Sequence, residues 1–290
     1  MKSLLINIPN SKIILWSECF GDENDSPLLL LAGAGQSGLY WPDRLCSTLA
    51  NNGHFVIRFD YRDVGASSRI DYDEVPYTLE DLATDTLAVL DAYHIKKADI
   101  IGLSMGGYIA QILAARYPEY IRTMTLISTS PDHRPAMAAI NGQDANVYEL
   151  PSPLPEAFNA WKPKNTPQTS LESFLTTMQL YVRKKGFDEQ EIIALKNRLD
   201  QHASHRESKT INHRKATMAS NERTELLRTI KVPTLVIHGN QDIIFPIEHA
   251  LATTKLIPHA NLEIIPEMGH CISNYFIDQL YHILAKFLSA

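Results

Sequence analysis

Apolar runs alternate along this chain with segments whose apolar positions recur at helical spacing. The runs, each long enough for one strand, cover 28–31, 54–60, 98–103, 123–128, 234–238 and 262–265. Continuous apolar runs are typical of parallel strands that are buried on both faces of a sheet. The pattern therefore predicts an α/β fold, with a mostly parallel central sheet flanked by helices.

The alternation stops over 131–229, where no convincing strand is found. Prolines interrupt the first half of this stretch, and helical patterns follow at 171–185 and 188–203. Open α/β sheets bind their ligands at the carboxyl ends of the strands. We therefore predict a helical cap insertion over 131–229, placed above a core built from 1–130 and 230–290. A separate helical domain is the alternative.

Composition narrows the possible partners. The chain has 290 residues, of which 44% are hydrophobic, and a formal net charge of −6. This charge and the lack of a Lys/Arg run argue against nucleic acid as a partner. No segment approaches the ~20 apolar residues that a membrane-spanning helix needs, and the three cysteines lack metal-ligand spacing. We expect a cytoplasmic protein that acts on a small molecule without a metal, in an oligomeric state that stays open.

A serine flanked by glycines stands between a predicted strand and a predicted helix. The segment Gly102-Leu103-Ser104-Met105-Gly106 ends the run at 98–103 and begins an alanine-rich helical pattern. Such a strand–turn–helix unit is a nucleophile elbow, which lifts the serine Oγ clear of the sheet. The glycines are needed because side chains would collide where the strand and the helix meet. We interpret Ser104 as a nucleophile.

A serine hydroxyl needs a general base, and the chain order serine, acid, histidine places both partners in the last loops. His270 stands in the loop after 262–265, and none of the other ten histidines is placed this way. Asp242 stands in the loop after 234–238, where its carboxylate can orient the imidazole. We predict Asp242 as the acid and His270 as the base, with Asp132 as the first alternative for the acid.

The oxyanion that develops during attack needs two backbone N–H donors. Met105, directly after the serine, lies at a helix N-terminus and can supply one. The loop after 28–31 can supply the other, because its small residues let the backbone approach the substrate. This loop reads Ala32-Gly33-Ala34-Gly35-Gln36-Ser37-Gly38. The residues leave Gly33 and Ala34 as alternative donors.

With these motifs the chain resembles an α/β-hydrolase, from the amino-terminal hairpin to the last helix and least across 131–229. Within that superfamily, Trp41-Pro42-Asp43 and the segments 56–67 and 102–107 resemble the aclacinomycin methylesterase type of carboxylic ester hydrolase. The resemblance implies the α/β-hydrolase fold and a structural role for the loop 60–67.

The same resemblance implies roles for individual residues. It suggests Ser104 as nucleophile, Asp242 as acid and His270 as base. It also suggests Gly33 and Met105 as the two oxyanion donors.

From these observations we expect a serine hydrolase that cleaves a carboxylic ester of a small hydrophobic molecule, with no metal or organic cofactor. Thioester, lactone and carbon–carbon bond hydrolysis use the same triad and stay as alternatives, as does a ligand-binding member without turnover. Trp161, Phe174 and Met178 are the candidates for substrate contact in the cap. Their apolar character favours a medium-sized or bulky hydrophobic acyl group. A small alcohol joined to it is in keeping with the resemblance to the methylesterase type.

Overall fold

The computed structural model describes residues 2–161, 170–204 and 209–289. Within them an eight-stranded sheet forms the centre, in the order β1-β2-β4-β3-β5-β6-β7-β8. The strands are β1 (Lys2–Asn7), β2 (Ile14–Phe20), β3 (Ser26–Leu31), β4 (His54–Phe59), β5 (Ala98–Leu103), β6 (Ile121–Ile127), β7 (Thr234–Gly239) and β8 (Asn261–Ile265). Strand β2 pairs antiparallel with β1 and β4, and the other pairs are parallel. The predicted mostly parallel sheet is confirmed.

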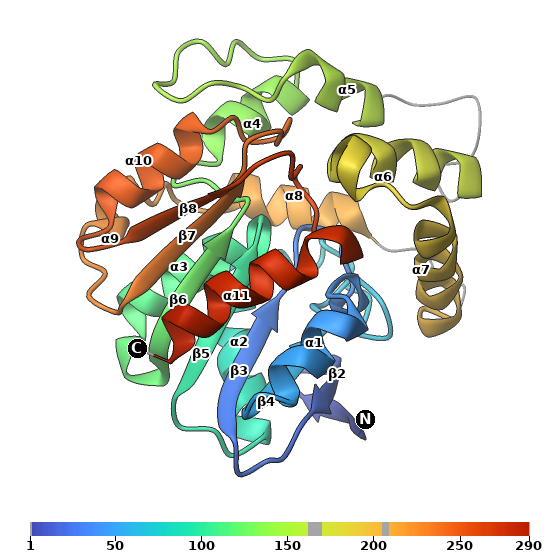
Figure 1. Ribbon diagram of the computed structural model, residues 1–290, viewed down its shortest axis with the longest axis vertical. Coiled ribbons are helices and arrows are strands. Elements are labelled where there is room, and N and C mark those ends of the chain that lie inside the picture. Colours follow the sequence, from blue (N-terminus) through green and yellow to red (C-terminus); the bar gives the residue numbers. More distant parts are fainter. Residues whose placement is uncertain (1, 162–169, 205–208, 290) are drawn as a thin grey trace.

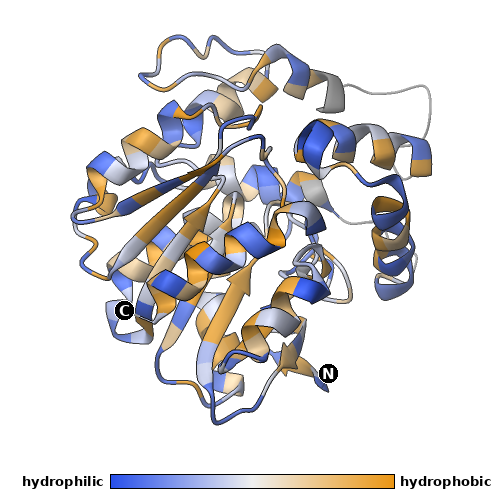
Figure 2. Ribbon diagram, in the orientation of Figure 1, coloured by the Kyte–Doolittle hydropathy of each residue, from blue (hydrophilic) through white to orange (hydrophobic). Residues whose placement is uncertain are grey.

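Helices cover both faces of the sheet (Figure 1). One face carries α1 (Asp43–Ala50) and α11 (Ile277–Leu288), and the other carries α2 (Leu79–Ala92), α3 (Met105–Arg116) and α10 (Glu248–Leu256). Alternate residues of β3 serve the two faces, because successive side chains of a strand point in opposite directions. Leu28 and Leu30 pack with the α1 and α11 side, whereas Leu29 and Leu31 pack with the α2 and α3 side. The strands are accordingly among the most hydrophobic parts of the molecule (Figure 2).

The chain between β6 and β7 is helical in the part that the structure describes. It holds α4 (Arg134–Ile140), α5 (Pro155–Trp161), α6 (Leu171–Gly186), α7 (Glu189–His202), α8 (Thr210–Ala219) and α9 (Thr224–Leu227). The patterns at 171–185 and 188–203 predicted α6 and α7, while the four shorter helices were not predicted. Helices α5, α6 and α8 lie toward the end of the sheet at which the parallel strands finish (Figure 1). No helix in the described ranges is long and apolar enough to cross a membrane.

Candidate active site

Ser104 occupies a strained turn between β5 and α3. Its backbone has φ 54° and ψ −117°, in a region that residues other than glycine rarely adopt. Strain of this kind persists only where the surrounding structure imposes it. Ser104 is partly exposed, whereas its neighbours in β5 and α3 are buried. The turn therefore lifts one hydroxyl out of an otherwise closed junction.

The two flanking glycines make this junction possible. A Cβ atom added to Gly106 would lie 2.2 Å from the Leu31 carbonyl oxygen, and one added to Gly102 would lie 2.4 Å from the Gly106 carbonyl oxygen. Both contacts are with backbone atoms, which a rotamer change does not relieve. The glycine spacing in the sequence therefore reflects close packing of β3, β5 and α3 around the serine.

Three side chains from separate loops form one hydrogen-bonded chain. Ser104 Oγ lies 3.1 Å from His270 Nε2, and His270 Nδ1 lies 2.8 Å from Asp242 Oδ2. An ionised carboxylate can only accept, so Nδ1 carries the proton and Nε2 is left to accept from the serine hydroxyl. The three residues that the sequence analysis selected are thus brought together in the geometry of a nucleophile, a base and an orienting acid.

Asp242 is buried but well stabilised as an anion. Its Oδ1 atom accepts hydrogen bonds from the backbone N–H groups of Ile244 at 2.8 Å and Phe245 at 3.0 Å. Burial by itself would raise the pKa of this carboxyl, but His270 and the hydrogen bonds hold the pKa below its ordinary value. The Nε2 atom of buried His238 lies 3.6 Å from Asp242 Oδ2 and forms a hydrogen bond of 2.8 Å with the Phe245 carbonyl oxygen. The carboxylate is therefore charged at neutral pH.

The loop of His270 rests on helix α6. The Tyr181 carbonyl oxygen accepts from the backbone N–H of His270 at 2.7 Å and of Cys271 at 3.2 Å. This carbonyl serves the loop where α6 is interrupted, because Arg183 has φ 60° and breaks the helix two residues later. The rings of Tyr181 and Phe245 lie 5.9 Å and 5.6 Å from the imidazole, measured between ring centroids. The position of the base thus depends on the segment between β6 and β7 as well as on the sheet.

A second serine–histidine pair has a different setting. Ser130 Oγ lies 2.7 Å from His249 Nδ1, but His249 Nε2 lies 2.9 Å from the Pro151 carbonyl oxygen and not beside a carboxylate. Ser130 and His249 are both fully buried. The alternative acid, Asp132, binds the Arg134 side chain at 2.8 Å. The Ser130 hydroxyl is thus buried, and Asp132 is paired with Arg134, whereas His270 Nδ1 faces Asp242.

The loop after β3 presents its backbone N–H groups next to the serine. A Cβ atom on Gly33 would lie 3.4 Å from Ser104 Cβ, so the loop passes in contact with the nucleophile. The Gly33 N–H donates to Gln36 Oε1 at 3.1 Å, and the Gly35 N–H donates to His213 Nδ1 at 2.9 Å. In the part of the chain that the structure describes, the Ala34 N–H between them has no acceptor.

Met105, the first residue of α3, presents a similar unpaired donor. Its N–H has no acceptor among residues 2–161, 170–204 and 209–289. The side chains that hold the opposing loop were missed by the sequence analysis. Gln36 lies within the loop itself, whereas His213 comes from α8, 178 residues away from Gly35.

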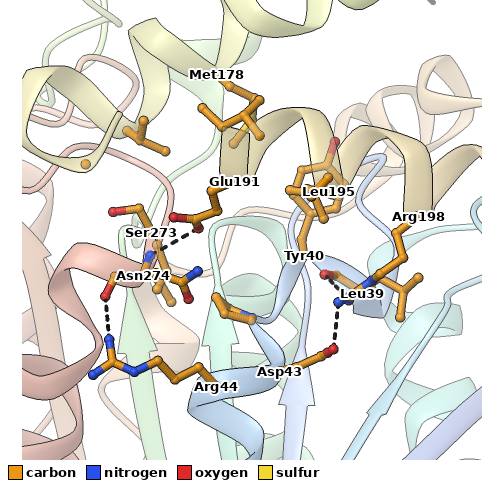
Figure 3. Close-up of a pocket in the computed structure, with 16 residues that line it drawn as sticks. Leu39, Tyr40, Asp43, Arg44, Met178, Glu191, Leu195, Arg198, Ser273 and Asn274 are labelled. Atoms are coloured by element: carbon orange, nitrogen blue, oxygen red, sulfur yellow. Dashed lines mark hydrogen bonds and ion pairs between the residues drawn. The ribbon is translucent and has the colours of Figure 1, made fainter. Parts of the chain in front are cut away.

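The predicted cap residues have different surroundings. A cavity of about 320 Å³ lies between α6, α7 and the core, and Met178 lines it together with Tyr40 and Leu195 (Figure 3). Phe174 packs near Tyr40, with 6.5 Å between ring centroids. The lining residues of this cavity do not include Ser104. Trp161 ends α5, and its side chain lies outside the described residues.

In the described ranges, no three His, Cys, Asp or Glu side chains are grouped so that they could hold a metal ion. The cysteines at 19, 46 and 271 are all buried and unbridged.

Comparisons with known proteins extend over most of the chain. The family model for the α/β hydrolase fold matches residues 26–273. Rhodomycin D methylesterase DauP of Streptomyces sp. (strain C5) is 35% identical over 274 residues, which cover 91% of each chain. Rhodomycin D methylesterase DnrP of Streptomyces peucetius is 33% identical, also over 91% of each chain. A crystal structure of a hydrolase from Pseudomonas aeruginosa PA01 superposes with a TM-score of 0.76 at 23% identity, covering 99% of this chain and 98% of that one.

Proposed function

The chain belongs to the α/β-hydrolase family, and on this basis we propose that it is a serine hydrolase that cleaves a carboxylic ester through an acyl-enzyme. The resemblance to the methylesterase type, inferred from three short motifs, is confirmed by the two rhodomycin D methylesterases. One observation carries the proposal furthest: Ser104, His270 and Asp242 form a continuous hydrogen-bonded chain that ends on the partly exposed hydroxyl.

The reaction follows from the direction of these hydrogen bonds. As Ser104 Oγ attacks the ester carbonyl carbon, His270 Nε2 takes the hydroxyl proton and Asp242 stabilises the imidazolium that forms. The same proton passes to the leaving alcohol, and the acyl group stays on Ser104. A water molecule then repeats the attack with His270 as base, which releases the acid and the free serine.

The oxyanion is assigned to the N–H groups of Ala34 and Met105. Of the two alternatives left by the sequence, Gly33 already donates its N–H to Gln36 Oε1, whereas the Ala34 N–H has no acceptor in the described chain. Ala34 is also exposed. This choice replaces Gly33, which the family resemblance suggested, because one N–H does not serve two acceptors equally well.

The substrate we propose is a methyl or other small-alcohol ester of a bulky hydrophobic acid. The names of the relatives support the small alcohol, since both are methylesterases. The rings of Tyr181 and Phe245 beside the imidazole support an apolar surrounding for the acyl group. Thioester, lactone and carbon–carbon bond hydrolysis remain alternatives with the same triad.

The test is steady-state hydrolysis of a graded ester panel in which acyl size and alcohol size vary separately. We expect the highest kcat/KM for methyl esters of bulky hydrophobic acids. Ser104→Ala should remove the activity, and Ser47→Ala on the exposed face of α1 should leave it unchanged as the matched control. Equal turnover by Ser104→Ala contradicts the proposed mechanism, while a preference for acetyl esters of large alcohols contradicts only the proposed substrate.

A further inference from the structure

The oxyanion loop, residues 32–38 with the proposed donor Ala34, is held by a side chain from the segment between β6 and β7. His213 Nδ1 accepts from the Gly35 N–H at 2.9 Å, and His213 Nε2 lies 2.8 Å from the Arg62 carbonyl oxygen. A carbonyl oxygen can only accept, so Nε2 carries the proton and Nδ1 is the acceptor. His213 is fully buried, and burial lowers its pKa, which keeps the ring in this neutral form. Both ring nitrogens are thus committed to fixed backbone partners.

Helix α8 is itself anchored to the core on the same side. The Asn212 side chain donates to Asp63 Oδ2 at 3.0 Å and to the Ile70 carbonyl oxygen at 3.1 Å. The Lys209 N–H donates to the Asp63 carbonyl oxygen at 2.9 Å. These contacts join the start of α8 to the loop after β4, so His213 has little freedom to move away from Gly35.

Gln36 holds the other side of the oxyanion loop. Its backbone N–H donates to the Gly33 carbonyl oxygen at 3.1 Å, which closes a four-residue turn with Gly35 at φ 69°. Its side chain accepts from the Gly33 N–H at 3.1 Å through Oε1 and donates to Cys271 Sγ at 3.5 Å through Nε2. Cys271 directly follows His270, so Gln36 connects the oxyanion loop to the loop of the base.

We propose that His213 and Gln36 are positioning residues that orient the Ala34 N–H toward the transition-state oxyanion. The two side chains accept from the N–H groups on either side of Ala34, and the Ala34 N–H between them is left without an acceptor in the described chain. An N–H group that already points toward the position of the oxyanion does not have to reorient when negative charge develops there. Stabilisation of the transition state by such preoriented donors is the basis of an oxyanion hole. The proposal rests on the proposed ester hydrolysis, because attack of Ser104 on a carbonyl carbon is the step that places an oxyanion here.

The experiment compares His213→Phe, which keeps a ring but loses the acceptor, with His213→Asn, whose Oδ1 can replace Nδ1. We expect His213→Phe to lower kcat by roughly 10- to 100-fold, which is less than the 10²–10³-fold loss from removing a donor outright. KM should change by about twofold or less, and His213→Asn should recover most of kcat. The inhibition constant of a trifluoromethyl ketone, which forms a tetrahedral oxyanion adduct on serine, should rise in parallel with the loss of kcat.

The matched control is Ser220→Ala at the other end of α8. Ser220 Oγ accepts from the Leu79 N–H at 2.8 Å, so the change removes a helix-to-core hydrogen bond without touching the oxyanion loop. Its kcat should stay near the wild-type value, as judged on protein with an unchanged circular dichroism spectrum. Gln36→Leu, at a partly exposed position, gives a second test in case His213→Phe does not fold.

The outcomes separate the two proposals. A folded His213→Phe or Gln36→Leu variant with wild-type kcat and inhibitor affinity overturns the positioning proposal and leaves ester hydrolysis standing. An equal loss of kcat in Ser220→Ala also overturns it, because general loosening of α8 would then explain the effect. A wild-type protein without esterase activity contradicts both proposals.

Discussion

The nucleophile elbow and the oxyanion loop touch each other, yet different interactions hold them. The elbow is built from backbone packing, with Gly106 pressed against the Leu31 carbonyl at the junction of β3, β5 and α3. The oxyanion loop is fixed by two side chains, Gln36 from within the loop and His213 from α8. One half of the site therefore belongs to the sheet, while the other depends on the segment between β6 and β7.

The largest effect should come from the triad that activates the serine of the elbow. His270→Ala removes the base, and triad deletions of this kind lower kcat by about 10⁶-fold in a protease. We expect hydrolysis of the preferred methyl ester to fall by roughly 10⁴- to 10⁶-fold while Tm changes little. Stopped assays with high enzyme concentration measure the residual rate. A loss of less than about tenfold would remove His270 from the role of base.

The second-largest loss of kcat should come from Asp242→Asn. The Ile244 and Phe245 N–H groups hold an oxygen at the Oδ1 position, so the amide NH2 faces His270 Nδ1 and donates to it. The imidazole is then held in the wrong tautomer, an effect of roughly 10⁴-fold in a protease triad. Steady-state kcat on the same ester measures it. His238→Gln is the matched control, since His238 lies 3.6 Å from the same carboxylate without bonding to His270. Comparable losses in both variants would show that general repacking, and not the tautomer, limits activity.

The oxyanion loop should show an intermediate effect. Ala34→Pro removes the proposed donor, and proline suits the second position of the turn that Gly33 and Gln36 close. We expect kcat to fall by roughly 10²- to 10³-fold with little change in KM. Ala34→Ser, which keeps the N–H, is the control. Wild-type kcat in a folded Ala34→Pro variant would move the second donor elsewhere.

The elbow and the oxyanion loop also differ in how far the sequence predicted them. The elbow, Asp242 and His270 could be predicted because each depends on local pattern: glycine spacing, or a loop directly after an apolar strand. Which of the Gly33 and Ala34 N–H groups has an acceptor could not be predicted, because it depends on where the Gln36 side chain bonds. The hydrogen bond between His213 and Gly35 could not be predicted either, because the two residues are 178 positions apart in the sequence. His213 also lies on a ten-residue helix in which few apolar residues recur at helical spacing.

The interruption of α6 at Arg183 also could not be predicted from the sequence. The apolar pattern over 171–185 is continuous and predicts one helix, whereas Arg183 adopts φ 60°. The interruption is a product of tertiary packing, because the Tyr181 carbonyl there accepts two N–H groups from the loop of His270. Local propensity carries no information about such a distant acceptor.

The smallest effect should be a difference in pH dependence of stability. Burial lowers the pKa of His213 below 6.5, an effect opposed by Asp63 and reinforced by the Arg62 and Arg69 cations. The unfolded chain therefore binds a proton that the folded protein does not, and this group destabilises the fold as pH falls below about 6.5. Asp242 has a pKa below 3.8 in the fold, so its contribution is present above about pH 3.8 and is lost only at lower pH.

Urea unfolding of wild type and His213→Phe at pH 7 and pH 5 measures this difference. We expect the free energy of unfolding to fall by less in the variant than in the wild type between these two pH values. A tenfold difference in proton affinity between the folded and unfolded states is worth about 1.4 kcal/mol, which sets the scale of the change. An identical decrease in both proteins would mean that His213 is not held neutral by the fold.

The most direct test of the proposed chemistry is covalent labelling with a fluorophosphonate probe, followed by peptide mapping by mass spectrometry. We expect one labelled site, Ser104, in the wild-type protein, and a labelling rate reduced by at least about 10²-fold in His270→Ala, because the hydroxyl then lacks its base. A folded wild-type protein that stays unlabelled, or one labelled at a different serine such as Ser130, would contradict Ser104 as the nucleophile of this enzyme.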